Sequence, residues 1–176
     1  VDAGFDFSCG VKAGGTVWCW GDDTDGRLGN GAVLTADQTT PTQVSGLRDV
    51  AKVAVGASHA CAIKRNGEVW CWGDNAEYEL GNGLNTDSAV PVQVSTTTEF
   101  VDIAAGNLFS CGVAYGGTGY CWGKGTNGTM GNGANTANQT PGIVSTVTDF
   151  VSINARRDMD AACGVTKRGT GYCWGA

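Results

Sequence analysis

The stretch WCWGDNAEYELGNG, residues 70–83, recurs in closely similar form at two other places in the chain. It appears upstream as WCWGDDTDGRLGNG, residues 18–31, and downstream as YCWGKGTNGTMGNG, residues 120–133. The Trp-Gly pairs follow one another at intervals of 52, 50 and 52 residues, with their tryptophans at Trp20, Trp72, Trp122 and Trp174. Self-similarity at a fixed period indicates a repeat protein, in which each unit buries its apolar faces against its neighbours.

This period divides the chain into a half unit and three full units. The half unit is residues 1–21, and the full units are residues 22–73, 74–123 and 124–175. The chain holds four cysteine hairpins but three of the segments that connect them, so it begins and ends in mid-pattern. We therefore expect either a stretch of a longer polypeptide or several copies that complete a ring or an extended array.

Composition indicates an all-β chain. The 176 residues include 29 glycines and only 16% charged residues, which argues against a helical protein. Runs such as DVAKVAVG, residues 49–56, and FVDIAAG, residues 100–106, are short, rich in β-branched or aromatic residues, and end in turn residues, as strands do. Because no apolar run approaches about 18 residues, the sequence predicts no membrane span.

The eight cysteines form four pairs with nine residues between partners. The pairs are Cys9 with Cys19, Cys61 with Cys71, Cys111 with Cys121 and Cys163 with Cys173. In CAIKRNGEVWC, a three-residue loop at 65–67 with Gly67 in the left-handed conformation closes a hairpin that sets Cys61 opposite Cys71. At a site of the antiparallel ladder without hydrogen bonds the Cα atoms lie about 4.5 Å apart, within the range of disulfides. The sequence therefore predicts four cross-strand disulfides.

Two alternatives for the cysteines stay open at this point. A zinc site needs ligands in groups of four with short spacing, whereas this chain spaces its cysteines widely and has a single histidine, His59. Buried free thiols would also fit four strands. Since disulfides persist mainly outside the reducing cytosol, the disulfide interpretation predicts a secreted or cell-surface protein.

The same hairpins predict sheets that are apolar on both faces. Neighbouring residues of a strand face opposite ways, so Cys61 and Cys71 line one face while Trp70 and Trp72 line the other. Such a sheet must be covered on both sides. With about 50 residues per unit, the natural arrangement stacks small antiparallel sheets around an axis, as in a β-propeller, which also protects strand edges.

The pattern G-D-N-x-x-x-x-L-G-N-G, residues 73–83, and the pattern V-x-x-V-A-x-G-x-x-H-x-C-A-I-x-x-x-G-x-V-W-x-W-G, residues 50–73, resemble the repeat of the regulator of chromosome condensation family. The resemblance extends over the whole chain. It implies propeller blades of four strands, typically seven in a ring, with glycine-rich stretches making tight turns and close contacts between blades. About three and a half blades are then present, as part of a seven-bladed ring.

Two places depart from the family pattern. The histidine position is held by His59 in one unit but by Phe7 and Phe109 in others. In the last unit Arg156 replaces the glycine found at equivalent positions, and two extra residues precede Cys163. This segment is interpreted either as a drifted surface loop or as a partner-contact site, whose charged residues are Arg156, Arg157, Asp158 and Asp160.

Candidate catalytic and metal-binding chemistry is sparse. Asp22, Asp23 and Asp25 resemble part of a calcium loop, but equivalent positions elsewhere carry fewer carboxylates, so a plain turn is favoured. His59 is expected to be packed and bonded to backbone. No serine or cysteine has a matching histidine and acid partner, and no pair of carboxylates stands out as acid and base. The sequence predicts no active site and no cofactor.

Charge and loop composition set the expected function. A net charge of -6 and a pI near 4.5 disfavour binding to nucleic acid. The polar loops at residues 32–40, 84–90 and 134–140 vary between repeat landmarks, and loops on a rigid scaffold commonly carry binding. Asn127 and Asn138 match the glycosylation acceptor pattern.

The leading hypothesis is a non-enzymatic extracellular scaffold that binds a protein or glycan partner through these rim loops. The alternatives are a secreted enzyme inhibitor, the propeller part of a larger surface enzyme, and a subunit of an extracellular assembly. The family's nucleotide-exchange activity on a small GTPase is not carried over, because disulfides indicate a different compartment.

Overall fold

The computed structural model describes residues 1–33, 36–145 and 147–176, and these residues form β-strands joined by turns and loops. The strands make four antiparallel sheets, three of four strands and one of three. The first sheet contains β1 (Asp2–Ala3), β2 (Phe7–Val11), β3 (Val17–Gly21) and β4 (Gln38–Gln43). The second contains β5 (Val50–Val55), β6 (His59–Lys64), β7 (Val69–Gly73) and β8 (Ser88–Gln93).

The remaining sheets repeat this order. The third contains β9 (Phe100–Ala105), β10 (Phe109–Ala114), β11 (Gly119–Gly123) and β12 (Asn138–Ile143). The fourth contains β13 (Phe150–Ala155), β14 (Ala161–Thr166) and β15 (Gly171–Gly175). Two short 3-10 helices, η1 (Thr24–Gly26) and η2 (Thr126–Gly128), lie in the loops that follow β3 and β11. The predicted all-β fold is confirmed.

Each sheet is centred on the hairpin that carries a cysteine pair. In the second sheet Cys61 pairs directly with Cys71. The backbone N–H of Lys64 donates to the carbonyl of Glu68 at 2.9 Å, and Gly67 has a φ of +85°. This is the predicted three-residue turn, and the same cysteine register recurs in the other three hairpins.

Disulfides join all four pairs across their hairpins, with Cα–Cα distances between 4.0 and 4.1 Å. The predicted connectivity is therefore confirmed, and neither zinc ligands nor free thiols are needed to account for the eight cysteines. Each bridge closes a short loop inside one sheet. The bridges consequently stiffen individual sheets, while apolar packing must hold the sheets to one another.

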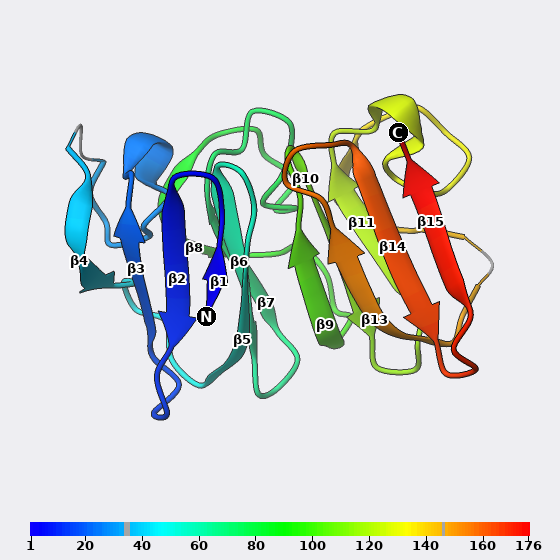
Figure 1. Cartoon of the computed structure of the whole chain (residues 1–176), viewed down its shortest axis with the longest axis horizontal. Helices are drawn as coiled ribbons and strands as arrows, with labels where there is room; N and C mark the ends of the chain where they lie inside the picture. Colours follow the sequence, from blue (N-terminus) through cyan, green and yellow to red (C-terminus); the bar gives the residue numbers. More distant parts are fainter. Residues whose placement is uncertain (34–35, 146) are drawn as a thin grey trace.

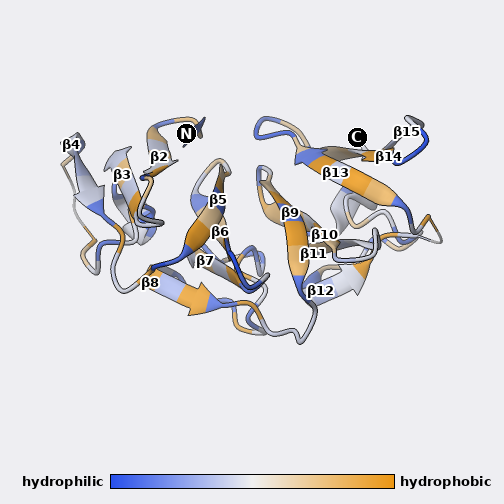
Figure 2. Cartoon of the chain, turned by 90° about the horizontal axis from the view of Figure 1, so that it is seen from below, coloured by the Kyte–Doolittle hydropathy of each residue, from blue (hydrophilic) through white to orange (hydrophobic). Residues whose placement is uncertain are grey.

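The four sheets follow one another along an arc (Figures 1 and 2). In Figure 2 the outer strands β4 and β8 lie on the convex side of the arc, whereas β5 and β9 lie nearer its concave side. The inner strands contact one another in sequence, β1 with β5, β5 with β9 and β9 with β13. This arrangement is that of about three and a half propeller blades.

The arc has two different edges (Figure 1). The hairpin edge, lower in Figure 1, carries the hairpin turns and the connections that lead from one sheet to the next. It consists of residues 12–16, 44–49, 64–68, 94–99, 115–118, 147–149 and 167–170. The loop edge, upper in Figure 1, consists of residues 4–6, 22–33, 36–37, 56–58, 74–87, 106–108, 124–137 and 156–160.

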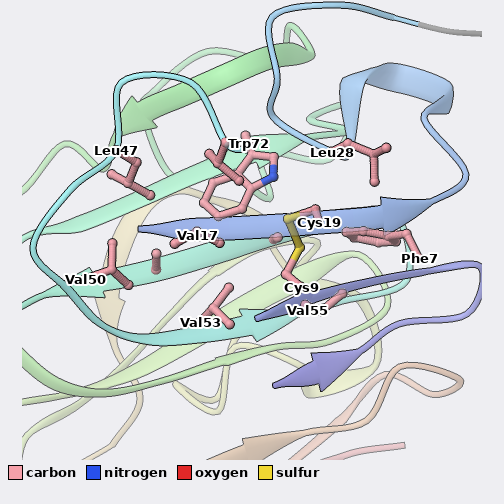
Figure 3. Close-up of a cluster of buried hydrophobic side chains, with 13 residues drawn as sticks. Phe7, Cys9, Val17, Cys19, Leu28, Leu47, Val50, Val53, Val55 and Trp72 are labelled. Atoms are coloured by element: carbon pink, nitrogen blue, oxygen red, sulfur yellow. A yellow bond between two sulfur atoms is a disulfide. The ribbon is translucent and has the colours of Figure 1, made fainter. Parts of the chain in front are cut away.

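The core lies between consecutive sheets and uses both of their faces. In the first interface Trp72 of the second sheet packs over the Cys9–Cys19 bridge of the first sheet (Figure 3). Trp122 and Trp174 take the equivalent places in the next two interfaces. The prediction that the cysteine face and the tryptophan face are both covered is confirmed for these interfaces.

The glycines of the LGNG stretches are explained by this packing. Gly29 has a φ of +67°, and a Cβ there would lie 2.7 Å from the Trp72 indole, too close for any side chain. Gly81 and Gly131 have the same left-handed conformation and the same contact with Trp122 and Trp174. Each glycine therefore both turns the chain and lets the next sheet approach.

Each of these indoles also forms a buried or partly buried hydrogen bond. Its Nε1–H donates to a backbone carbonyl in the loop after the third strand of the preceding sheet, at 2.8 to 3.1 Å. The acceptors are the carbonyls of Arg27, Glu79 and Thr129. A buried Trp N–H needs such a partner, so these bonds fix the position of one sheet on the next.

Candidate functional site

The loop edge holds every charged residue that the sequence singles out. It is built from the long loops after β3, β7 and β11 and from the connections between the first and second strands of each sheet. Its aspartate turn at 22–26 belongs to the first sheet, and its charged insertion at 156–160 belongs to the fourth.

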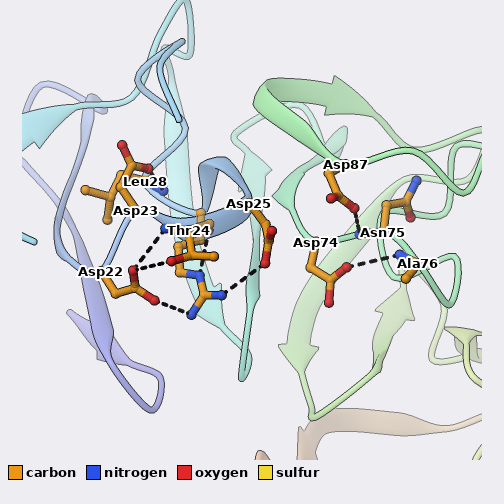
Figure 4. Close-up of polar contacts among 10 residues, drawn as sticks. Asp22, Asp23, Thr24, Asp25, Leu28, Asp74, Asn75, Ala76 and Asp87 are labelled. Atoms are coloured by element: carbon orange, nitrogen blue, oxygen red, sulfur yellow. Dashed lines mark hydrogen bonds and ion pairs between the residues drawn. The ribbon is translucent and has the colours of Figure 1, made fainter. Parts of the chain in front are cut away.

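The aspartate turn, whose Asp22, Asp23 and Asp25 are labelled in Figure 4, is organised around a cation of the chain itself, Arg27. Its guanidinium lies 2.8 Å from Asp22 and 3.2 Å from Asp25. Burial raises the pKa of Asp22, but hydrogen bonds from Thr24 and the charge of Arg27 outweigh burial, so that the pKa is lowered. Arg27 thus neutralises the carboxylates that the calcium interpretation needs.

Asp23 points the other way. It is fully buried, and its carboxylate accepts hydrogen bonds from the backbone N–H of Leu28 at 3.1 Å and from the amide of Asn30 at 3.4 Å. The three aspartates therefore do not converge, and within the described ranges no three His, Cys, Asp or Glu side chains are grouped to hold a metal ion. The geometry favours the plain turn over the calcium loop.

The next unit builds the same turn from different residues. Asn75 replaces Asp23: it is buried, and its side-chain oxygen accepts from the backbone N–H of Leu80 at 2.9 Å. The pKa of Asp74 is raised by burial and then by the charges of Asp87 and Asp25. The turns of the first two units thus present carboxylates to each other across the sheet interface, as Figure 4 shows.

The insertion of the fourth sheet, residues 156–160, has one part that faces outward and one that faces inward. Arg156 and Asp158 form an exposed pair with bonds of 3.1 and 2.9 Å. Arg157 instead reaches across the concave side, where it donates to the carbonyl of Val55 at 2.6 Å and pairs with Asp2. Sequence reasoning grouped these residues, whereas the structure separates them.

Asp160 is also turned inward. Its carboxylate pairs with Lys124 at 3.2 Å and accepts from the side-chain amide of Asn127 at 3.2 Å. It therefore ties the insertion to the loop that follows β11 of the third sheet. Of the four predicted partner contacts, Arg156 and Asp158 remain the ones most available to another molecule.

His59 is wholly buried at the interface between the second and third sheets. Its Nε2 is 2.8 Å from Oγ of Ser110, and that hydroxyl donates to the carbonyl of Glu79 at 3.0 Å. Burial lowers the pKa of His59 to about 3, so the ring is neutral at ordinary pH. The prediction that His59 bonds to the backbone was wrong, because its partner is the side chain of Ser110 in the next sheet.

The variable loops are held firmly where they leave the sheets. The backbone N–H of Gly31 donates to the carbonyl of Ala89 at 2.8 Å, and that of Gly83 donates to the carbonyl of Gln139 at 3.1 Å. The loops at 32–40 and 84–90 are therefore fastened to the outer strand of the next sheet. Residues 34 and 35 of the first loop lie outside the described residues.

The two glycosylation patterns have their asparagine side chains engaged. The amide of Asn127 donates to Asp160, and the amide of Asn138 donates to the carbonyl of Cys121 at 3.1 Å. Attaching a glycan at either amide nitrogen would disturb these bonds. In the part of the chain that the structure describes, no helix is both long and apolar enough to cross a membrane.

Family models and solved structures identify the repeat. The model of the Regulator of chromosome condensation (RCC1) repeat matches residues 14–63 and 66–113, and a second model of the same repeat matches residues 50–79. The chain is 39% identical over 85 residues to the human E3 ubiquitin-protein ligase HERC2, covering 47% of this chain and 2% of that protein. It is 35% identical over 69 residues to RUG3, a mitochondrial RCC1 domain-containing protein of Arabidopsis thaliana, covering 38% of this chain and 15% of that protein.

Structural similarity extends over almost the whole chain. The structure of human WBSCR16 matches with a TM-score of 0.85 and 21% identity, covering 98% of this chain and 46% of that one. Yeast RCC1 (Prp20), in its complex with Kap60, matches with a TM-score of 0.80 and 22% identity, covering 98% of this chain and 42% of that one. The chain thus spans less than half the length of these propellers and a small part of the matched sequence relatives. On the repeat match and the shared architecture together, this chain belongs to the RCC1 repeat family and folds as an arc of its β-propeller.

Proposed function

We propose that this chain is a non-enzymatic extracellular scaffold that contacts its partner with the loops at residues 32–40, 84–90 and 134–140. Yeast RCC1 (Prp20), whose fold this chain shares, is bound to Kap60 in its solved structure, which supports a binding role for this chain. The four disulfides support an extracellular location, since such bonds persist mainly in oxidising compartments.

The observation that carries this proposal is the way the loops are anchored. Gly31 and Gly83 are bonded to the outer strand of the following sheet, and Asn82 braces its loop by accepting from the backbone N–H of Leu84 at 3.0 Å. A binding loop that is already ordered loses less conformational freedom when the partner arrives. The scaffold would contribute to affinity mainly through this rigidity.

The loops also present apolar contacts to a partner. Val33, Leu84 and Val90 are 63%, 61% and 42% exposed. Polar residues of the same loops, such as Asn85 and Thr86, can supply the polar surround of such an apolar contact. A protein surface fits this chemistry, and a glycan would have to use the polar neighbours instead.

The test is site-specific photo-crosslinking on the longest natural polypeptide that contains this segment. A photoreactive residue at Leu84 or Asn135 should label one discrete extracellular protein, identified by mass spectrometry. The same residue at Ala51, on the concave side, is the matched control and should not label that protein. Labelling from Ala51 alone, or from none of the three positions, would overturn the proposal.

A further inference from the structure

The two edges of the arc carry very different charge. The loop edge holds eleven carboxylates and four cations, and the hairpin edge holds four carboxylates and six cations. The cations of the hairpin edge are Lys12, Arg48, Lys64, Arg65, Lys167 and Arg168. The net charge of -6 therefore belongs to the loop edge and the inner strands, while the hairpin edge has an excess of positive charge.

Ion pairing increases the difference in charge between the two edges. Each loop-edge cation has a carboxylate partner, as Arg27 has Asp22 and Lys124 has Asp160. On the hairpin edge Lys64 pairs with Glu68. Among the residues that the structure describes, the side chains that carry a positive charge without an ion pair are Lys12, Arg48, Arg65, Lys167 and Arg168. All five lie on the hairpin edge.

Exposed aromatic and apolar side chains accompany these cations at the hairpin of the second sheet. On one side of its tip, an open groove of about 440 Å³ is lined by Arg65, Glu99, Val101 and Tyr115. Tyr115 is 83% exposed and Val101 is 53% exposed. Tyrosine and arginine beside an exposed aliphatic surface make up the composition that dominates the energy of protein interfaces.

A second groove with similar side chains lies near the same hairpin. A smaller groove of about 190 Å³ is lined by residues that include Arg48, Asp49, Lys64 and Trp70. The Trp70 ring is partly buried, and its indole N–H donates to Glu68 at 3.3 Å. Residues 64–67 therefore adjoin two grooves, each with an aromatic ring and an arginine that has no ion pair.

We propose that the hairpin edge around Arg65 binds an acidic polypeptide segment that carries an aromatic or aliphatic anchor. The segment's carboxylates meet Arg48 and Arg65, and its apolar side chain lies against Tyr115 and Val101. Asp49 and Glu99 also line these grooves, so they repel acidic groups placed away from the arginines and restrict the register. This inference rests on the proposed role as an interaction scaffold and adds a second contact surface on the opposite edge.

The charges involved are exposed to solvent, which predicts a salt-dependent interaction. Exposed charges are screened over about 8 Å at physiological ionic strength. Charge complementarity of this kind mainly raises the association rate and suppresses wrong partners, whereas the aromatic anchor supplies affinity. A lysine-rich segment would be rejected on the hairpin edge.

The test uses fluorescence anisotropy with a defined probe on the natural full-length polypeptide. The probe is a fluorescein-labelled peptide made of repeated Glu-Glu-Phe-Ser units, and its counterpart replaces glutamate with lysine. Arg65→Glu and Tyr115→Ala should each weaken binding of the acidic probe about tenfold. Lys52→Glu, at a half-exposed cation of the inner strand β5 that belongs to neither edge, makes the same change of charge; it is the matched control and should leave binding unchanged.

The proposal is overturned if Arg65→Glu binds the acidic probe as the parent does, if Lys52→Glu weakens binding as much as Arg65→Glu, or if the lysine peptide binds as well as the acidic probe. Near-ultraviolet circular dichroism of each variant checks that the fold is intact. Failure of crosslinking from the loops would leave this binding in place, so the two proposals fail separately.

Discussion

The first three disulfides and the fourth occupy equivalent hairpins but different environments. The cysteines of the first three pairs are fully buried, whereas Cys163 and Cys173 are exposed. In the first three sheets the tryptophan of the next sheet covers the bridge. Val165, on the same face as Cys163, is 41% exposed, while its counterpart Val113 is buried. The hairpin sequence therefore determines the bridge, and the neighbouring sheet determines its protection.

The largest expected effect comes from removing a tryptophan that packs over a buried disulfide. Trp122→Ala should lower the free energy of unfolding by about 3 to 5 kcal/mol, because it leaves a cavity over Cys61–Cys71 and removes one of the two hydrogen bonds to the carbonyl of Glu79. Trp174→Ala should cost distinctly less, since Trp174 is only partly buried. Urea denaturation followed by circular dichroism measures both, and equal losses would contradict the comparison.

The second prediction concerns reduction of the bridges. In the chain of residues 1–176, Cys163–Cys173 should open first under graded reductant because both cysteines are exposed, and the three buried bridges should open only on unfolding. Loss of one such short-loop bridge removes about 2 to 3 kcal/mol of stabilisation. Alkylation followed by peptide mass spectrometry identifies the bridge that opens.

The control for this experiment is the double variant Cys163→Ala with Cys173→Ala. It should show no thiol at the reductant concentration that opens the first bridge in the parent. Simultaneous opening of all four bridges in the parent would mean that exposure does not govern their order.

The third prediction compares Glu79 with Thr129, its counterpart in the next unit. Burial raises the pKa of the Glu79 carboxyl to about 8, from an ordinary value of 4.5. The folded chain therefore keeps a proton that the unfolded chain loses between these values, so stability should fall as the pH rises from about 4.5 to about 8. The slope is at most about 1.4 kcal/mol per pH unit.

Glu79→Gln should remove this pH dependence and stabilise the protein at pH 8, because an amide keeps an oxygen to accept from the backbone N–H of Glu77. Thermal unfolding at a series of pH values measures the effect. Thr129→Val should leave the slope of the parent unchanged and serves as the control. If the Glu79→Gln variant kept the same dependence of stability on pH, a group other than Glu79 would be responsible for it.

The smallest effects lie in the insertion at 156–160. Arg157→Ala should cost about 1 kcal/mol, because it removes the bonds to Val55 and Asp2 that join the fourth sheet to the first two. Arg156→Ala should leave the unfolding temperature unchanged, since its pair with Asp158 is exposed. Differential scanning calorimetry compares the two, and equal losses would place both residues in one structural role.

Much of the architecture was accessible from local patterns. The hairpin turns place each cysteine opposite its partner because antiparallel register follows from the length of the turn, as Lys64 and Gly67 illustrate. The alternation of Cys61 and Trp70 predicted two covered faces, and both are covered at the interfaces between sheets. The aspartate turn was less accessible, because nothing local indicates that Arg27 folds back between Asp22 and Asp25.

The amino-acid sequence by itself determined the strands, the hairpin register, the disulfide connectivity and the family, since these depend on neighbours within a few residues or on a repeated pattern. The tertiary structure alone decided which bridge is exposed, that His59 bonds to Ser110, and that Arg157 crosses to Val55. It also decided that the cations without an ion pair lie on the hairpin edge. These features depend on contacts between residues about 50 to 100 positions apart, and local pattern carries no information about such pairs.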